Sequence, residues 1–166
     1  MSFDDDFITK TNNIGILGTH GKINKNIIVD DIILPAINQF NIAKLTHVFM
    51  PFEGESSIYI EDYFERCKNK PQIIQYSLDW KKNGPSSRNL RDTQIINNST
   101  YFIIFLGKKS TYYEKMAEKL VKKGKHVITV SYIDYQLTVL EPYIKDISPP
   151  QKKKRIDKSI IEYFNT

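Results

Sequence analysis

Short apolar runs and amphipathic stretches alternate along most of the chain. The runs are rich in isoleucine, valine, phenylalanine and tyrosine, which is typical of β-strands. Several of them have no polar interruption, and this indicates strands buried on both faces, as in a parallel sheet. The five predicted strands are residues 14–17, 46–50, 72–78, 101–106 and 126–130.

The stretches between these runs have the spacing of amphipathic helices. Apolar residues recur there every three or four positions, so that they fall on one helix face. Pro35 should kink the first helix or divide it in two, because proline has no N–H to donate. N-caps are expected at Ser56 or Ser57 and at Ser86 or Ser87. The predicted helices are residues 28–40, 58–67, 90–97 and 111–123.

Helices between successive strands provide the connections that parallel strands need. We therefore predict the α/β class: a three-layer Rossmann-like domain with a mainly parallel five-stranded sheet and a C-terminal helix. Residues 1–13 are polar and are interpreted as a flexible leader, and residues 14–166 as a single domain. The pattern weakens after residue 130, where residues 133–147 fit a strand, a short helix or a loop. Apolar spacing then predicts a helix over residues 152–165, which packs on the sheet or pairs with a second copy.

Composition narrows the classes of function. The net charge of +5 comes mostly from dispersed lysine, which favours an anionic ligand. A nucleic-acid partner is not expected, because the basic run at residues 152–155 has no interleaved aromatic residues. Cys67 is the single cysteine, so no internal disulfide is predicted. The chain has no Cys/His cluster, so no metal site is expected, and no cofactor is predicted. Without a signal-peptide pattern or an apolar run of ~20 residues, we expect a cytoplasmic protein with no membrane contact.

Ligands of open parallel sheets bind outside the carboxyl ends of the strands, so the loops that follow the predicted strands form the candidate site. The first loop, with Gly18, Thr19 and His20, offers backbone N–H groups and a hydroxyl to a phosphate or carboxylate. A tight turn would need the same glycine, and His20 could equally be solvated or cap a helix. The patterns Gly-x-Gly-x-x-Gly and Gly-x-x-x-x-Gly-Lys-[Ser/Thr] are absent, which argues against a standard NAD site and a P-loop NTPase.

The second loop combines acidic side chains with hydroxyls at the start of a predicted helix. Gly54, Ser56 and Ser57 would suit an anion, because backbone N–H groups at a helix start are unpaired. Glu53 and Glu55 could hold ribose hydroxyls, as an acidic residue does in dinucleotide sites. The alternative is a simple N-cap whose acidic residues match the helix dipole.

The third loop, residues 79–89, is the densest polar cluster in the chain. Arg88 stands at a predicted helix start, where its guanidinium could form a fork to phosphate, and Asn89 could fix a base or a ribose. Trp80 could stack on a base or anchor the loop in the core. The fourth loop begins with Gly107, which we include among the candidate ligand-binding residues.

A family resemblance rests mainly on the third loop. The run Asp79-Trp80-Lys81-Lys82-Asn83-Gly84-Pro85-Ser86-Ser87-Arg88-Asn89, followed by a helix and an aromatic-rich strand, resembles the SLOG superfamily of Rossmann-like nucleotide-binding proteins. It is most similar to the small branch with a tryptophan, a glycine-rich stretch, Arg-Asn and a strand that ends in an aromatic residue. The resemblance spans residues 14–130 and implies binding of a nucleotide or a nucleotide-derived signal, sometimes with cleavage at the ribose. The Pro-Gly-Gly-x-Gly-Thr-x-x-Glu motif of the phosphoribohydrolase branch is missing, so that activity is not supported.

Two functions follow as expectations. The first is a sensor or sequestering module that binds a nucleotide or a nucleotide-derived signalling molecule. The alternative is an enzyme that cleaves or transfers at the N-glycosidic bond of a nucleoside or nucleotide, for which a carboxylate would serve as nucleophile or stabiliser. The pattern leaves open whether the protein forms a homo-oligomer. The candidate catalytic carboxylates are Glu53, Glu55, Asp79 and Glu114.

Overall fold

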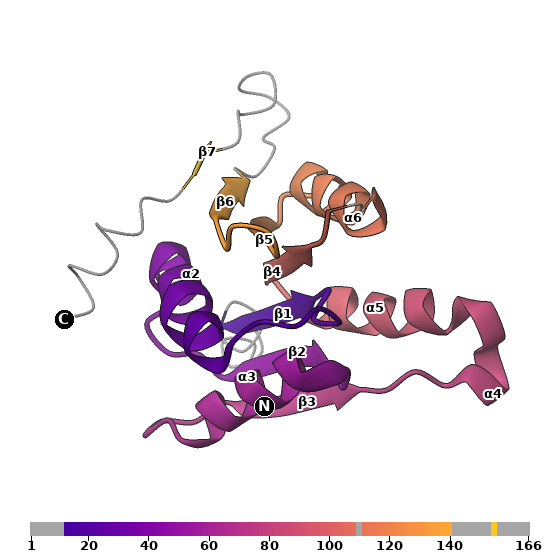
Figure 1. The fold of residues 1–166 in the computed structure, drawn as a ribbon, viewed down its shortest axis with the longest axis horizontal. Coiled ribbons are helices and arrows are strands. Elements are labelled where there is room, and N and C mark those ends of the chain that lie inside the picture. The colour runs from indigo at the N-terminus through magenta and orange to yellow at the C-terminus, as the bar shows by residue number, and fades with distance from the viewer. Residues whose placement is uncertain (1–11, 109–110, 141–153, 156–166) are drawn as a thin grey trace, which may run out of the picture.

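The computed structural model describes residues 12–108, 111–140 and 154–155. Its centre is a seven-stranded sheet with the strand order β3-β2-β1-β4-β5-β6-β7 (Figure 1). Neighbouring strands from β3 to β5 are parallel, whereas β6 and β7 are added antiparallel. The strands are β1 (Asn13–Leu17), β2 (His47–Pro51), β3 (Gln72–Tyr76), β4 (Tyr101–Leu106), β5 (His126–Ser131), β6 (Leu137–Leu140) and β7 (Lys154–Arg155).

Helical segments cover both faces of the sheet. Segments η1, α2 and α3 pack on one face, and α5 and α6 pack on the other. A short helix, α4, and a 3₁₀ turn, η2, lead from β3 into α5. The segments are η1 (Ile27–Ile33), α2 (Leu34–Phe40), α3 (Gly54–Glu65), α4 (Trp80–Asn83), η2 (Gly84–Ser86), α5 (Ser87–Asn98) and α6 (Thr111–Lys122).

Strand β4 shows why its apolar run has no polar interruption. Ile103 and Phe105 lie in the core beneath η1, α2 and α3. Phe102 and Ile104 point the other way, into the core beneath α5 and α6. All four side chains are fully buried, because successive residues of a strand point to opposite faces and both faces are covered.

The predicted α/β class and the five parallel strands are confirmed, but the predicted number of strands is wrong. Strand β6 lies within the stretch whose structure the sequence left open, and it pairs with β5 after a tight turn. Residues 154–155 form β7, at a place where a C-terminal helix was expected, and the other residues of that expected helix lie outside the described part. Strand β1 starts at Asn13, which is the last residue of the predicted leader. Residues 1–11 of that leader lie outside the described part of the chain.

The structure tests the predictions made for Pro35 and for the N-caps of α3 and α5. The segment that contains Pro35 changes there from a π-helix to an α-helix, and Pro35 occupies the first turn of α2. The backbone is helical on both sides of Pro35, so the π-helical turns before it accommodate a residue that has no N–H to donate. The expected N-cap at Ser56 or Ser57 is wrong, because α3 begins earlier, with Glu53 at the N-cap position. Helix α5 has Ser86 at its N-cap position, as predicted, but the serine side chain makes no capping hydrogen bond.

The strand order contains one topological switch point, between β1 and β4. The connection that leaves β1 crosses to the face covered by α2, whereas the connection that leaves β4 crosses to the face covered by α6. Loops that diverge in this way leave a crevice at the carboxyl edge, which is where open α/β sheets bind ligands. The fold thus directs attention to the residues just after β1 and β4.

Candidate functional site

The loop after β1 is held very close to β4. Gly18 has φ +79°, and a Cβ placed there would lie 2.4 Å from the carbonyl oxygen of Phe105. The hydroxyl of Tyr132, which follows β5, donates a hydrogen bond to the carbonyl of Gly18 and accepts one from the N–H of Gly21 at 3.0 Å. Gly18 therefore serves a close approach of two backbones, which only glycine permits.

Hydroxyl groups tie this loop to the start of α3. Thr19 is buried, and its Oγ1 lies 3.0 Å from Oγ of Ser57. Ser57 Oγ also lies 2.7 Å from the carbonyl oxygen of Glu53, and Ser56 Oγ donates to the carbonyl of Gly21 at 2.7 Å. Both serines are fully buried. These three predicted ligand-binding hydroxyls thus join the first and second loops together.

A charged network lies beneath the loops. The guanidinium of Arg91 donates from Nε and Nη2 to Oδ1 of Asp92, at 3.1 and 3.0 Å. Its Nη1 donates to Oε2 of Glu53 at 3.1 Å. The other oxygen of Asp92 accepts hydrogen bonds from the hydroxyls of Tyr112 and Tyr113, at 3.2 and 3.1 Å. We call Glu53, Arg91, Asp92, Tyr112 and Tyr113 the edge network.

Burial and the charged neighbours shift the pKa values of the edge network. The side chain of Arg91 is 1% exposed and that of Asp92 is 0% exposed. Burial raises the pKa of Asp92, and Arg91 opposes that rise. Burial alone would lower the pKa of Arg91, but Asp92 and Glu53 outweigh it, so its pKa is raised. Burial and the carboxylate of Asp92 raise the pKa of Tyr112 to about 12 and also raise that of Tyr113. The pair Arg91–Asp92 is thus an ion pair with hydroxyl donors around it, as a buried charge requires.

Above the network, Glu53 turns its second carboxylate oxygen outward. Oε1 of Glu53 lies 4.0 Å from Nη2 of Arg88, and the Arg88 side chain is 47% exposed. His20 is exposed nearby, with its ring centroid 6.0 Å from those of both Tyr113 and Tyr132. An acceptor, a cation and an aromatic cluster therefore face the same edge, and the acceptor is held from below by Arg91.

The predicted site residues of the third loop mostly lie elsewhere. Asp79 accepts a hydrogen bond from the backbone N–H of Lys82 at 3.1 Å and so caps α4. Trp80 is 57% exposed, so its predicted alternative role as an anchor in the core is wrong. Figure 1 shows α4 at the tip of an arm, residues 77–86, that projects beyond the carboxyl ends of the strands. Arg88, at the base of this arm, is the residue that the fold brings to the edge network.

The remaining candidates are spread along the edge. Gly54 has φ +70° in the first turn of α3, and Gly107 follows β4. Asn89 lies on the far side of α5, where it lines a groove against α6. Glu55 and Glu114 are exposed in the first turns of α3 and α6 and have no ion pair with another described residue. Of the four candidate catalytic carboxylates, Glu53 alone belongs to the edge network.

Sequence reasoning missed Arg91, Asp92, Tyr113 and Tyr132. A signal for the first two was present, because they fall one turn from Ile95 on the apolar face of the predicted helix. An adjacent arginine and aspartate at buried helix positions indicate a paired internal charge, since neither would be buried alone. Tyr132 carried no comparable signal, because its position depends on the turn after β5.

Comparison of the chain with protein-family models, with curated proteins and with solved structures finds no match. The class is therefore defined by the fold itself, a Rossmann-like α/β domain with a mostly parallel sheet. Among the described residues, no group of three or more His, Cys, Asp or Glu side chains is placed to hold a metal ion. In the same part of the chain, no helix is long and apolar enough to cross a membrane.

Proposed function

We propose that the protein binds a nucleotide or a nucleotide-derived signalling molecule at the carboxyl edge of the sheet, beside the switch point between β1 and β4. The observation that carries the proposal is the way Glu53 is held. One of its oxygens is fixed by the buried Arg91 at 3.1 Å, and the other faces the exposed Arg88. A carboxylate held in this way presents an acceptor in a defined direction at little entropic cost.

The chemistry around Glu53 matches the parts of a nucleotide. Its outward oxygen would accept hydrogen bonds from ribose hydroxyls, as acidic residues do in other sites of this fold class. Arg88 would pair with phosphate, for which a guanidinium has the right donor geometry. The exposed ring of His20, next to Tyr113, would lie against the base. The starts of α3 and α5 add partial positive charge at the same edge.

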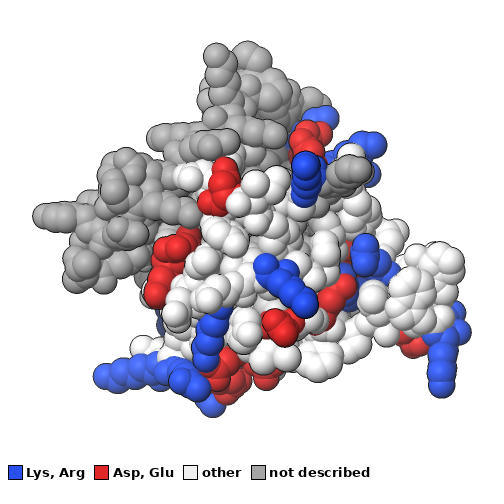
Figure 2. Space-filling model, viewed as in Figure 1, with Lys and Arg blue, Asp and Glu red and all other residues white. Residues whose placement is uncertain are grey.

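Two further observations support binding at this edge. The resemblance to the SLOG superfamily implies the same ligand class and includes Arg88. The face shown in Figure 2 carries basic and acidic side chains interspersed over its described part. A nucleic-acid surface would be expected to show a continuous basic field instead. A small anionic ligand at a local arginine fits this charge distribution better.

Cleavage or transfer at an N-glycosidic bond is the second candidate. It is favoured by the position of Glu53, which combines partial burial with an outward oxygen at the edge. Such a carboxylate would stabilise the positive charge that develops on a ribose ring as the bond to the base breaks. Glu55, Asp79 and Glu114 remain candidates only if substrate reaches beyond the edge network.

The test is thermal denaturation of the purified protein against a panel of nucleosides, mono- and dinucleotides, ADP-ribose forms and cyclic nucleotides. A ligand that binds the folded state raises the midpoint by mass action. With the best ligand, Arg88→Ala should raise Kd at least ~10-fold, because a charged hydrogen bond contributes about 1.5–3 kcal/mol. Arg66→Ala is the matched control, because this exposed arginine at the end of α3 pairs with Asp62 instead.

Two outcomes would contradict the proposal. If no member of the panel shifts the midpoint, nucleotide binding is wrong. If a ligand binds but Arg88→Ala leaves Kd unchanged, the site lies elsewhere. Chromatography of each binding mixture decides between the two functions: intact ligand indicates a sensor or sequestering module, and free base indicates an enzyme. In the second case Glu53→Gln should abolish release of base while the variant remains folded.

A further inference from the structure

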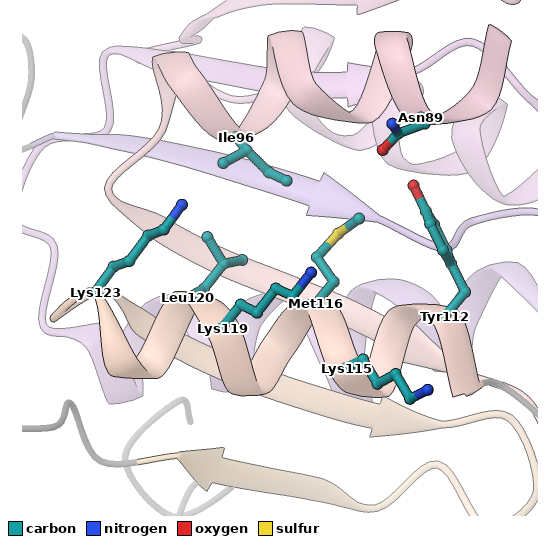
Figure 3. Close-up of a pocket in the computed structure, with 8 residues that line it drawn as sticks. All are labelled: Asn89, Ile96, Tyr112, Lys115, Met116, Lys119, Leu120 and Lys123. Atoms are coloured by element: carbon teal, nitrogen blue, oxygen red, sulfur yellow. The ribbon is translucent and has the colours of Figure 1, made fainter. Parts of the chain in front are cut away.

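A groove of about 250 Å³ runs between α5 and α6, on the outer surface of that helix layer (Figure 3). Its apolar floor comes from Ile96 on α5 and from Met116 and Leu120 on α6. Asn89 and Tyr112 face each other across one end (Figure 3). We call this feature the α5–α6 groove. Neither Glu53 nor Arg88, which carry the proposed ligand site, lines this groove, and Tyr112 is the one residue that it shares with the edge network.

The rim of the groove on the α6 side carries three exposed lysines, Lys115, Lys119 and Lys123. None of them forms an ion pair with another described residue. The acidic residues of α6, Glu114 and Glu118, do not line the groove. Unpaired like charges in a row repel one another, so the groove would gain from a negatively charged occupant.

The facing wall adds no negative charge of its own. The single carboxylate of α5 belongs to Asp92, which is fully buried and paired with Arg91. The residues of α5 that line the groove are Asn89 and Ile96, and both are neutral. The α5–α6 groove is therefore cationic on one rim, neutral on the other and apolar in between.

We propose that the α5–α6 groove binds an amphipathic α-helix of a partner protein, with a row of acidic residues along one side. The three lysines follow one another every four residues, which is about 6 Å along a helix axis. In a partner helix that lies along the groove, side chains four residues apart are also about 6 Å apart along the helix axis. Acidic residues at i, i+4 and i+8 would thus meet the lysines, and leucine-sized residues between them would reach Met116 and Leu120.

Size and composition favour this occupant over others. Pockets that enclose small molecules usually measure about 300–1,000 Å³, whereas this groove is smaller and elongated. Single-stranded nucleic acid binds through aromatic platforms for successive bases, and among the described residues Tyr112 is the one aromatic side chain of the lining. A methionine in the floor adapts to differently shaped apolar residues, as in other helix-binding grooves.

The test uses a fluorescent helical peptide of about 15 residues, a length at which helices begin to persist in water. It carries glutamate at every fourth position, leucine on the adjoining stripe and alanine elsewhere. Fluorescence anisotropy should show saturable binding to the wild-type protein. Lys119→Glu with Lys123→Glu should weaken binding at least ~10-fold, since it replaces two attractive contacts by two repulsive ones. Lys122→Glu with Lys68→Glu is the control, with equal charge change at exposed lysines outside the groove.

Two further peptides sharpen the result. A peptide with lysine in place of glutamate should bind the Lys119→Glu, Lys123→Glu variant better than it binds the wild type. A peptide with alanine in place of leucine should bind the wild type at least ~10-fold more weakly, because the apolar contact is lost.

The proposal is overturned if the two double variants bind the acidic peptide equally, or if its scrambled version binds as tightly. It is also overturned if an oligothymidine strand or anionic lipid vesicles compete at the groove more strongly than the peptide does. None of these measurements needs the nucleotide ligand, so the groove and the proposed ligand site can fail independently.

Discussion

The edge network and the arm around α4 are both polar and both lie at the carboxyl side of the sheet, yet they are built in opposite ways. Arg91 and Asp92 are buried and bonded to residues far away in the sequence, such as Glu53 and Tyr113. The arm is held by hydrogen bonds between residues close in the sequence, such as the one that the backbone N–H of Lys82 donates to the side chain of Asp79. Its tryptophan points largely into solvent.

This difference shows that polar residues which are close together in the sequence need not contact one another in the folded protein, and that polar residues which contact one another need not be close in the sequence. The arm concentrates functional-looking side chains within a few residues, but its contacts hold only the arm. The edge network draws its members from three connections and holds the site together. Residues that share a network depend on one another for stability, whereas locally bonded residues do not.

The largest effect is expected from breaking the buried ion pair. Asp92→Ala leaves the Arg91 guanidinium buried with Glu53 as its remaining carboxylate. Removing one partner of a buried pair typically costs about 3–5 kcal/mol of folding stability. Asp79→Ala in the arm removes only an exposed helix cap, which costs about 1 kcal/mol. Urea denaturation of both variants measures the difference in the free energy of unfolding.

A second variant keeps this prediction testable if Asp92→Ala does not fold. Replacing Arg91 by Met and Asp92 by Leu together removes both charges, so neither is left unpaired. This double variant should be more stable than Asp92→Ala, although it has lost more hydrogen bonds. Equal losses for Asp92→Ala and Asp79→Ala would show that the edge network contributes no more than the arm.

A smaller contrast is expected between two glycines with positive φ. Gly18 in the first loop has φ +79° and no room for a Cβ, whereas Gly84 in the arm has φ +53° and nothing within 4 Å of a Cβ. Alanine at Gly84 should cost about 1–3 kcal/mol from the backbone conformation alone, because φ +53° with ψ −135° lies outside the left-handed helical region. Alanine at Gly18 adds a clash with the carbonyl of Phe105, for a total of roughly 3 kcal/mol or more. Thermal denaturation of the two variants checks this order, and similar midpoints would contradict it.

The sequence predicted those strands and helices well whose positions follow from the spacing of their hydrophobic residues. The five parallel strands and the helices between them follow from runs buried on both faces and from amphipathic spacing. Strand β6 was left open as a strand, a short helix or a loop, because Leu137–Leu140 is short and only its two end residues are buried. The start of α3 was misplaced because its N-cap position, Glu53, makes no side-chain cap hydrogen bond, and two serines stood nearby.

The site was predictable only in outline. The rule that ligands bind at the carboxyl edge placed Thr19, Glu53 and Arg88 together, and the structure has them at that edge. The same rule could not tell that Trp80 would be carried outward on the arm, because this depends on the path of residues 77–86. Nor could it show Tyr132 reaching back to Gly18 across 114 positions of sequence.

The smallest effect concerns the ionisation of two tyrosine phenols at the carboxyl edge of the sheet. Burial raises the pKa of Tyr132 to about 12, and Tyr112 is raised to about 12, whereas phenols in an unfolded chain ionise near pH 10. Because the folded-state pKa is raised, the stability that these phenols contribute is fully present below about pH 10 and is lost as the pH rises towards about 12. The arm has no tyrosine, so this loss would act on the edge and not on the arm.

Tyrosinate absorbance after a rapid jump to about pH 11 measures this difference. The folded protein should show fewer ionised phenols than the same protein in concentrated urea, and the missing ones should appear only as the protein unfolds. Tyr132→Phe keeps the ring contact with Phe105, which has a centroid distance of 5.6 Å, but removes one slow phenol, so the slow absorbance change should fall by the equivalent of one tyrosine. If all phenols ionise at once in the folded protein, the hydroxyl of Tyr132 is not held against the first loop, and the close approach of Gly18 and Phe105 must then be maintained by backbone packing alone.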